Sequence, residues 1–298
     1  MYYKCVVLNP RESNEKVFTS GPVYGIEVTI PALAERCVVN LDPQHTGADA
    51  SRAAIEEALM VELPPEGAVL ATIRPDLDSV GAMAVLILRA EGKSLEPAKN
   101  RIRLVAESDK FAHGGWPGRR PIPTRDNPWP KSERPRVIAA IAAAVSDFHV
   151  RIEDRVKLME RWLLTGEEPA GYRERVELER MEMIAALENG GIKVDKAADG
   201  RIAVVRSTHR AATSIGYCVA PVVVALNPEF RFQGGEPIRK FTVCQFKPGY
   251  VDLRAVFADL SELEPGWGGS PTIGGSPQGR SSSITINKVV DVVEEHLL

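Results

Sequence analysis

Residues 1–110 alternate short apolar runs with stretches whose apolar positions recur at helical spacing. Such alternation is typical of an α/β fold in which helices cover a sheet of parallel strands. Helices are expected over residues 53–59 and 79–88, with Ser79 as the N-cap of the second helix. Strands are expected in the three apolar runs, at residues 36–41, 68–73 and 102–106.

The pattern changes twice further along the chain. Residues 114–136 are rich in proline and lack a regular apolar period, which predicts a loop. Helical spacing returns over 137–165 and 171–189. From residue 192 onward the runs are those of strands, followed by a glycine-rich stretch and a last helix at about 287–298.

The predicted fold class is therefore α/β, with two domains joined by a helical linker. The N-terminal domain has a mainly parallel sheet flanked by helices, and the smaller C-terminal α/β domain has a mixed sheet. The boundaries are set at residues 1–135 for the first domain, 136–190 for the linker and 191–298 for the second domain. A chain of 298 residues with 44% hydrophobic positions has the apolar surface that two such cores require.

Composition narrows the range of partners. The formal net charge is -3, so no overall basic field favours long duplex nucleic acid. The opening residues do not resemble a signal peptide, and no apolar run is long enough for a membrane span, so we expect a cytoplasmic protein. The 4 cysteines include no C-x-x-C pair, which argues against a thiolate zinc site.

Acidic residues follow each of the three predicted strands. Ligands of open α/β sheets collect at the carboxyl ends of the strands, and four carboxylates with two imidazoles there would repel one another or bind cations. Two Mn²⁺ or Mg²⁺ ions are the expected cofactors. The expected metal ligands are Asp42, His45, Asp76, Asp78, Asp109 and His113, of which Asp76, Asp78, Asp109 and His113 are also the expected catalytic residues. The alternative for the aspartates is a set of solvated turns and helix N-termini.

Residues 71–82 read ATIRPDLDSVGA and resemble the first motif of the DHH phosphoesterase superfamily, H-x-N-P-D-x-D-(S/A)-x-G/S. Two features depart from that family. Thr72 stands in the place of the motif's histidine, and the chain contains no D-H-H tripeptide. Asp42 and His45 offer an equivalent aspartate and histidine, although they precede the first motif, whereas the family's D-H-H follows it.

A second match lies in the C-terminal half. Residues 266–276 read GWGGSPTIGGS and, with the preceding VDLR, resemble the substrate-binding domain associated with DHH proteins, whose mark is an arginine strand followed by GGGH-x-x-A-A-G. Ser270 stands where that family has histidine. The resemblance, together with the polar residues that follow the strand at 202–205, implies this set of substrate-binding residues: Arg206, His209, Arg254, Gly268, Gly269, Ser270, Gly274 and Gly275. The alternatives are a solvated β-turn around Arg206 and, for the glycines, a hairpin that requires positive φ.

The loop 114–136 interleaves basic residues with Trp116 and Trp129. Such a segment can hold phosphates and stack a base of a single strand. The alternatives are a surface loop stiffened by proline and a contact in a homodimer.

These observations favour a metal-dependent phosphoesterase. The expected substrate is a phosphodiester, a short single-stranded oligonucleotide or another small phosphorylated molecule, bound between the two domains. The alternative is a catalytically decayed protein that binds a nucleotide or phosphate for regulation, and a third reading is a structural partner that uses the loop 114–136 as its interface.

Overall fold

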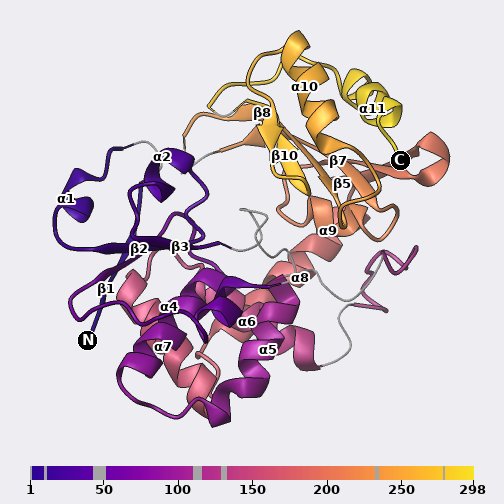
Figure 1. The fold of residues 1–298 in the computed structure, drawn as a ribbon. Helices are drawn as coiled ribbons and strands as arrows, with labels where there is room; N and C mark the ends of the chain where they lie inside the picture. Colours follow the sequence, from indigo (N-terminus) through magenta and orange to yellow (C-terminus); the bar gives the residue numbers. More distant parts are fainter. Residues whose placement is uncertain are drawn as a thin grey trace. The chain divides into compact units, whose positions relative to one another are not determined.

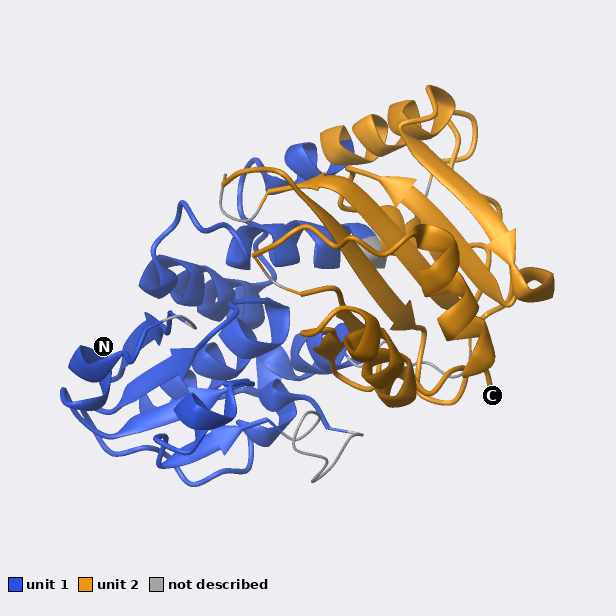
Figure 2. Cartoon of the chain, turned by 90° about the horizontal axis from the view of Figure 1, so that it is seen from above, with its two compact units in different colours: residues 1–113, 130–177 blue, residues 114–129, 178–298 orange. Residues whose placement is uncertain are grey.

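The computed structural model of the chain is drawn in Figure 1. The residues that it describes are 2–9, 12–42, 52–109, 116–128, 133–231, 235–277 and 279–298. They form two compact units, coloured separately in Figure 2: residues 1–113 and 130–177 make unit 1, and residues 114–129 and 178–298 make unit 2. No described helix combines the length and the apolar composition that a membrane crossing requires.

Unit 1 contains a four-stranded sheet in which every neighbouring pair is parallel. The strand order is β1-β4-β2-β3, with β1 at Lys4–Val7, β2 at Val23–Ile26, β3 at Val39–Leu41 and β4 at Val69–Thr72. The predicted parallel sheet is thus confirmed, and β3 and β4 lie within the runs expected at 36–41 and 68–73. Strands β1 and β2 were not singled out by the sequence pattern.

The helices of unit 1 cover both faces of this sheet. They are α1 (Glu15–Phe18), α2 (Pro31–Ala34), α3 (Ala54–Glu57), α4 (Leu77–Ala90), α5 (Lys99–Asp109), α6 (Glu133–Val145) and α7 (Ile152–Thr165), with a 3₁₀ turn, η1, at Glu96–Ala98. Alternate strand residues face opposite sides, so Val69 and Ala71 pack towards α1 and α2 whereas Leu70 packs towards α4 and α7.

The run at 102–106 is part of helix α5, and its assignment as a strand was wrong. Ile102, Val105 and Ala106 are the buried residues of this helix. Their spacing of three and four residues places them on one face of a helix, whereas Arg103 between them is exposed. A run of five residues was too short to separate the two periods.

The N-cap of helix α4 lies three residues before the expected one. The side chain of Asp76 accepts a hydrogen bond from the backbone N–H of Ser79 at 3.0 Å, and the Ser79 hydroxyl bonds back to the N–H of Asp76 at 3.0 Å. This reciprocal pair makes Asp76 the N-cap and Ser79 the third helical residue. Residues 77–88 of the helix are all buried, as its apolar composition predicts.

The helical segment expected as a linker belongs to the two units. Residues of α6 and α7, such as Ile141, Met159 and Trp162, pack in the same core cluster as α4. Helix α8 (Tyr172–Glu188) crosses the boundary of the units at residues 177 and 178. Helix α6 also begins at Glu133, before the expected position of 137, because the loop ends earlier than the prolines suggested.

Unit 2 contains a six-stranded mixed sheet in the order β5-β6-β7-β8-β10-β9. Only β6 and β7 are parallel, so the prediction of a mixed sheet is confirmed. Its elements are β5 (Ile192–Ala197), η2 (Ala198–Gly200), β6 (Ile202–Ser207), α9 (Ala212–Gly216), β7 (Val222–Phe230), β8 (Ile238–Gln245), α10 (Leu253–Leu263), β9 (Gly268–Gly269), β10 (Ile273–Gly275) and α11 (Ile286–Glu295).

Each face of this sheet has its own core. Val222 and Val224 of β7 pack with α10 and α11, whereas Val223 and Ala225 pack with α9 and the end of α8. The strict alternation along β7 is what a central strand covered on both faces requires. Residues 116–128 form a loop, as predicted, and Ile122 packs against the second of these cores.

Candidate metal centre

The parallel sheet of unit 1 brings several acidic residues to one edge. Glu27 follows β2, Asp42 follows β3, and Asp76 and Asp78 follow β4. Because the four strands run in the same direction, the residues after them lie at the carboxyl edge of the sheet. Asp109 joins them from the last position of α5. Asp42, Asp76, Asp78 and Asp109 are predicted site residues, and Glu27 is one that the sequence analysis missed.

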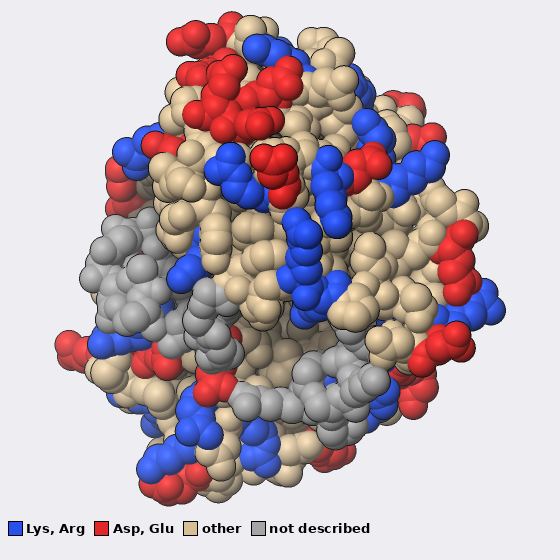
Figure 3. Space-filling view, turned by 90° about the vertical axis from the view of Figure 1, so that its right-hand side faces the viewer, with Lys and Arg blue, Asp and Glu red and all other residues tan. Residues whose placement is uncertain are grey.

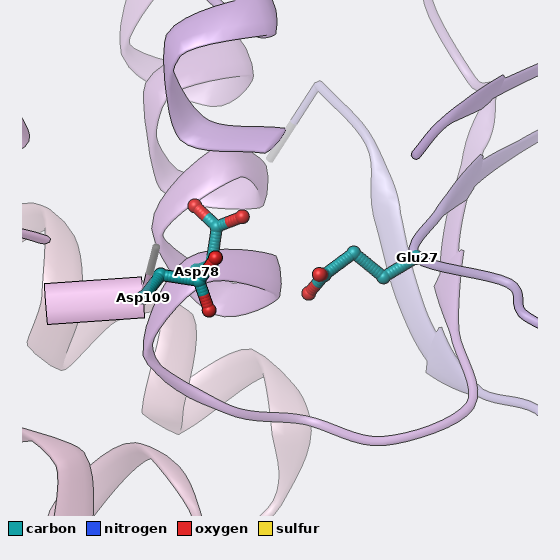
Figure 4. Close-up of side chains that lie close together, drawn as sticks. All are labelled: Glu27, Asp78 and Asp109. Carbon is teal, nitrogen blue, oxygen red and sulfur yellow. The ribbon is translucent and has the colours of Figure 1, made fainter. Parts of the chain in front are cut away.

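Glu27, Asp78 and Asp109 form the tightest group. One carboxylate oxygen of each lies within 4.8 Å of the other two. Figure 4 shows the Glu27 side chain reaching from the end of its strand towards the carboxylates of Asp78 and Asp109. We call these three residues the acidic cluster.

The Asp78 carboxylate is held in place by helix α3. Oδ2 accepts a hydrogen bond from the N–H of Ala54 at 2.6 Å, and Oδ1 accepts one from the N–H of Ile55 at 2.9 Å. A Cβ on Gly81 would lie 2.7 Å from the Ile55 side chain, so this glycine lets α3 pack close to α4. Each oxygen keeps a second lone pair, and Asp78 can therefore cap α3 and ligate an ion at once.

Glu27 has an unusual backbone and an unsatisfied side chain. Its φ is 53°, in the left-handed region that residues other than glycine seldom adopt. Its Oε2 is buried and has no hydrogen-bond partner within the described residues. A buried carboxylate oxygen without a partner is costly, and it indicates that a proton or a cation completes this site.

The electrostatics of the cluster favour the uncharged or metal-bound state. Burial, followed by the charges of Asp76, Asp78, Asp109 and Asp42, raises the pKa of Glu27 to about 11. Burial, followed by the charge of Asp109, raises the pKa of Asp78 to about 8, against the two backbone N–H groups that lower it. A divalent cation would remove the repulsion that causes part of both shifts.

Asp76 and Asp42 stand beside the cluster. Asp76 is partly occupied as the N-cap of α4, with Oδ1 accepting from the Ser79 hydroxyl at 2.8 Å as well as from its N–H. Asp42 is buried, with 4% of its surface exposed. Both act on the pKa of Glu27 through their charge. The structure thus brings together the four aspartates that the sequence singled out.

The donor set fits a hard divalent ion. Carboxylate oxygens are the ligands of Mg²⁺ and Mn²⁺, and a metal–oxygen bond of about 2.1 Å places opposite ligands about 4.2 Å apart. The 4.8 Å limit within the acidic cluster is slightly wider than this, so a small inward movement of side chains suffices.

Thr72, which stands in the place of the DHH histidine, is fully buried, and its Oγ1 has no partner within the described residues.

Comparison with known protein families and curated proteins finds no match that would assign a role to these residues. No family model matches the chain. No curated protein matches it either. The likeness to DHH phosphoesterases therefore rests on the motif residues given above and stays a prediction.

The two predicted histidine ligands, His45 and His113, lie outside the described residues. Glu27 could have been found by the rule that identified the aspartates, because it directly follows the apolar residues Val23–Ile26. That strand has only four residues and contains Gly25, and both features weaken its pattern.

Arg254 lies on helix α10 and not on the strand that the resemblance implies. The Asp252 side chain accepts hydrogen bonds from the N–H groups of Arg254 and Ala255, at 3.1 and 3.2 Å, and so caps the helix. Residues 253, 256, 257 and 260 are the buried face of α10. The side chain of Arg254 is exposed.

The predicted glycines form the hairpin of β9 and β10, and their main role is close packing. A Cβ on Gly275 would lie 2.1 Å from the carbonyl oxygen of Phe241, and one on Gly274 would lie 2.4 Å from the Phe257 ring. A Cβ on Gly269 would lie 2.3 Å from Gly274. None of these three has positive φ, so the hairpin needs them for space and not for backbone conformation. Gly268 alone has open space around it.

The polar residues predicted to bind substrate in unit 2 have partners within that unit. Arg206 pairs with Asp195 on the neighbouring strand at 3.0 Å. The Ser270 hydroxyl accepts from the N–H of Ile273 at 3.2 Å within its own turn. His209 accepts from the N–H of Ala211 through Nδ1 at 3.0 Å, which leaves Nε2 as the protonated nitrogen of the neutral ring. Arg206 lies within β6, which runs two residues beyond the strand expected at 202–205, so the turn begins after Ser207 and the exposed charge of Arg206 is paired along the sheet.

The described part of the basic loop packs within unit 2. Trp116 donates from Nε1 to the carbonyl of Tyr217 at 2.8 Å, and its N–H donates to the Tyr250 hydroxyl at 3.0 Å. The N–H of Arg120 donates to the carbonyl of Cys218 at 2.9 Å. Trp129 lies outside the described residues. On the face drawn in Figure 3, basic and acidic side chains both occur, in keeping with the small net charge.

Proposed function

We propose that unit 1 is the catalytic part of a divalent-metal phosphoesterase that hydrolyses a phosphodiester or another small phosphorylated substrate. The observation that carries the proposal is the acidic cluster, in which three carboxylates meet within 4.8 Å and one buried oxygen of Glu27 has no partner within the described residues. The resemblance of the sequence around Asp76 and Asp78 to the first DHH motif supports the same function.

In this proposal the carboxylates bind the metal ion and the backbone groups around them keep them in place. Glu27, Asp78 and Asp109 bind Mn²⁺ or Mg²⁺ through carboxylate oxygens. The N–H groups of Ala54 and Ile55 keep the Asp78 carboxylate from rotating, and the cap at Ser79 does the same for Asp76. When bound, such an ion lowers the pKa of a coordinated water towards neutrality and neutralises phosphoryl oxygens.

Glu27→Gln is the variant that tests the proposal. The amide has the size of the carboxylate and replaces a group whose Oε2 makes no hydrogen bond within the described residues, so the fold should tolerate it. Asp78→Asn is less suitable, because one donor of the new amide would face the N–H of Ala54 or Ile55. The matched control is Glu66→Gln at an exposed position.

The three proteins are loaded with Mn²⁺, desalted and examined for metal by mass spectrometry and for hydrolysis of bis-p-nitrophenyl phosphate and a short oligonucleotide. Wild type and Glu66→Gln should retain about one or two ions per chain and hydrolyse at least one substrate. Glu27→Gln should lose most of the metal and at least about tenfold in rate. A wild-type chain that neither retains Mn²⁺ nor is activated by it contradicts the proposal.

A second candidate function is binding of a nucleotide or phosphate without hydrolysis. It is favoured by Thr72, which is a poor metal ligand in the place of a histidine. Under this alternative, adenosine monophosphate or inorganic phosphate binds equally well with Mn²⁺ and with a chelator, and no hydrolysis is seen. Binding that requires Mn²⁺ would support the first function instead.

A further inference from the structure

The turn that follows β2 has to hold Glu27 in an unfavourable backbone conformation. A residue with a side chain at a φ of 53° is disfavoured by about 1 kcal/mol relative to the right-handed region. The N–H of Glu27 donates to the carbonyl of Leu41 on β3 at 3.0 Å, which fixes one side of the peptide. The other side of the turn, at Val28, has no strand partner in the sheet.

Asn40 holds Val28 in place of a strand. Its Oδ1 accepts from the N–H of Val28 at 3.1 Å, and its Nδ2 donates to the carbonyl of Val28 at 3.1 Å. One side chain thereby satisfies both polar groups of one residue. Only a primary amide has a donor and an acceptor in this arrangement, so neither Asp nor Leu, which have a similar size, can replace both hydrogen bonds.

Gly25 makes room for this contact. It lies opposite Asn40 in the register of β2 and β3. A Cβ at Gly25 would lie 2.6 Å from the Asn40 Oδ1 and 3.0 Å from the Val28 side chain. Its φ is not positive, so the glycine is needed here for space. We call Gly25, Asn40 and Val28 the amide clamp.

We infer that Asn40 is a positioning residue that fixes the left-handed turn at Glu27 and so directs the Glu27 carboxylate towards Asp78 and Asp109. The inference rests on the proposed metal centre. Asn40 ligates nothing in this arrangement, yet the metal affinity of the cluster depends on it, because a ligand held in place in advance loses less freedom on binding.

The test is a double-mutant cycle with Mn²⁺ alone as the probe. The dissociation constant for Mn²⁺ is measured by calorimetry for wild type, Asn40→Ala, Glu27→Gln and the double variant. Asn40→Ala should weaken binding about tenfold when Glu27 is present, and less than about twofold when Glu27 is already Gln. Asn287→Ala, an exposed asparagine on α11, is the matched control and should bind as wild type does.

A second variant reaches the clamp from the opposite strand. Gly25→Ala should displace the Asn40 side chain and weaken Mn²⁺ binding in the same way, while Asn40 itself is retained. Circular dichroism at the temperature of the titration establishes that each variant is folded. If Asn40→Ala does not fold, Gly25→Ala with and without Glu27→Gln provides the cycle.

The possible outcomes distinguish a failure of the inference about Asn40 from a failure of the proposed metal centre. If wild type does not bind Mn²⁺, the metal centre and the inference are both contradicted. If wild type binds and Asn40→Ala binds equally well, only the inference is overturned. The same holds if Asn40→Ala weakens binding by an equal factor in the Glu27→Gln background, since its effect would then not pass through Glu27.

Discussion

At the scale of single residues, Glu27 affects both metal binding and stability. Its carboxylate is a ligand in the proposed metal centre, but in the metal-free protein the ionised form is buried and destabilises the fold. Its folded-state pKa, about 11, lies above its unfolded value of about 4.5. The stability that this carboxyl contributes is therefore fully present below pH 4.5 and is lost as the pH rises towards 11. Without metal, the protein should be less stable at pH 9 than at pH 5.

Glu27→Gln should remove this loss of stability at high pH, because the amide does not ionise. In a chelating buffer, we expect the variant to melt at a higher temperature than wild type, by a margin that grows between pH 5 and pH 9. Thermal melts followed by circular dichroism measure the margin, and Glu66→Gln serves as the control. A margin that shrinks as the pH rises would show that Glu27 is not a buried protonated acid.

The same titrations make metal affinity depend on pH. Because the pKa of Asp78 is raised to about 8, an ion that binds below this pH displaces a proton. Mn²⁺ affinity should rise by up to about tenfold per pH unit and per displaced proton between pH 6 and pH 8. Calorimetry in two buffers of different ionisation heat counts the protons released, and a count of zero would contradict the raised pKa.

The limits of sequence reasoning at this site concern conformation more than residue type. Asp76 and Asp78 stand in a recognisable motif, and Asp42 follows an apolar run. Glu27 follows the same rule but comes after a short strand, and nothing in the local sequence predicts its left-handed backbone. That conformation depends on Asn40, 12 residues after Val28, and thus on the pairing of two strands.

At the scale of elements, the glycines of the β9–β10 hairpin can be present either for close packing or for backbone freedom, and two substitutions distinguish these explanations. Gly275→Ala should lower the free energy of unfolding by at least about 2 kcal/mol, because its Cβ would overlap the Phe241 carbonyl. Gly268→Ala meets no atom within 4 Å and should change it by less than about 0.5 kcal/mol. Urea denaturation measures both. Equal losses would show that backbone freedom, and not close packing, selects these glycines.

Elements were predictable where the apolar period was long. Helix α4 is buried over residues 77–88, and its sequence is apolar nearly all round. Helix α5 was taken for a strand because its central apolar run spans only residues 102–106. The position of Asp109 was nevertheless predicted correctly. It follows the apolar run at the end of helix α5, and this helix end lies at the carboxyl edge of the sheet, where a strand end was expected.

At the scale of the whole molecule, a bound ion should stabilise the part of the chain that holds it. Mn²⁺ should slow amide hydrogen exchange in β2, β4 and α3, whose ends carry or hold the acidic cluster. Exchange in β6 and β7, which belong to the separate cores of unit 2, should be unchanged. Mass spectrometry of peptides with and without Mn²⁺ measures both. Equal protection of both sheets would contradict a site confined to unit 1.

The division into two α/β parts followed from the change in pattern near residue 190. The assignment of the helices at 137–189 to one unit or the other did not follow from the sequence, because helical spacing alone does not say which core a helix joins. Residues of α6 and α7 complete the core of unit 1, and α8 contributes Met183 and Ile184 to unit 2.

Unit 2 takes in residues 114–129 as well as 178–298, and Trp116 is hydrogen-bonded to Tyr217 and Tyr250. Neither unit is therefore a single continuous stretch of the gene. A shuffling event that moved the C-terminal part as one cassette would leave Trp116 and Ile122 behind, and with them contacts of the unit 2 core. In the laboratory, a fragment of residues 178–298 would lack Trp116 and Ile122, whereas a fragment that begins near residue 114 would keep them but would also carry residues 130–177 of unit 1 without their core.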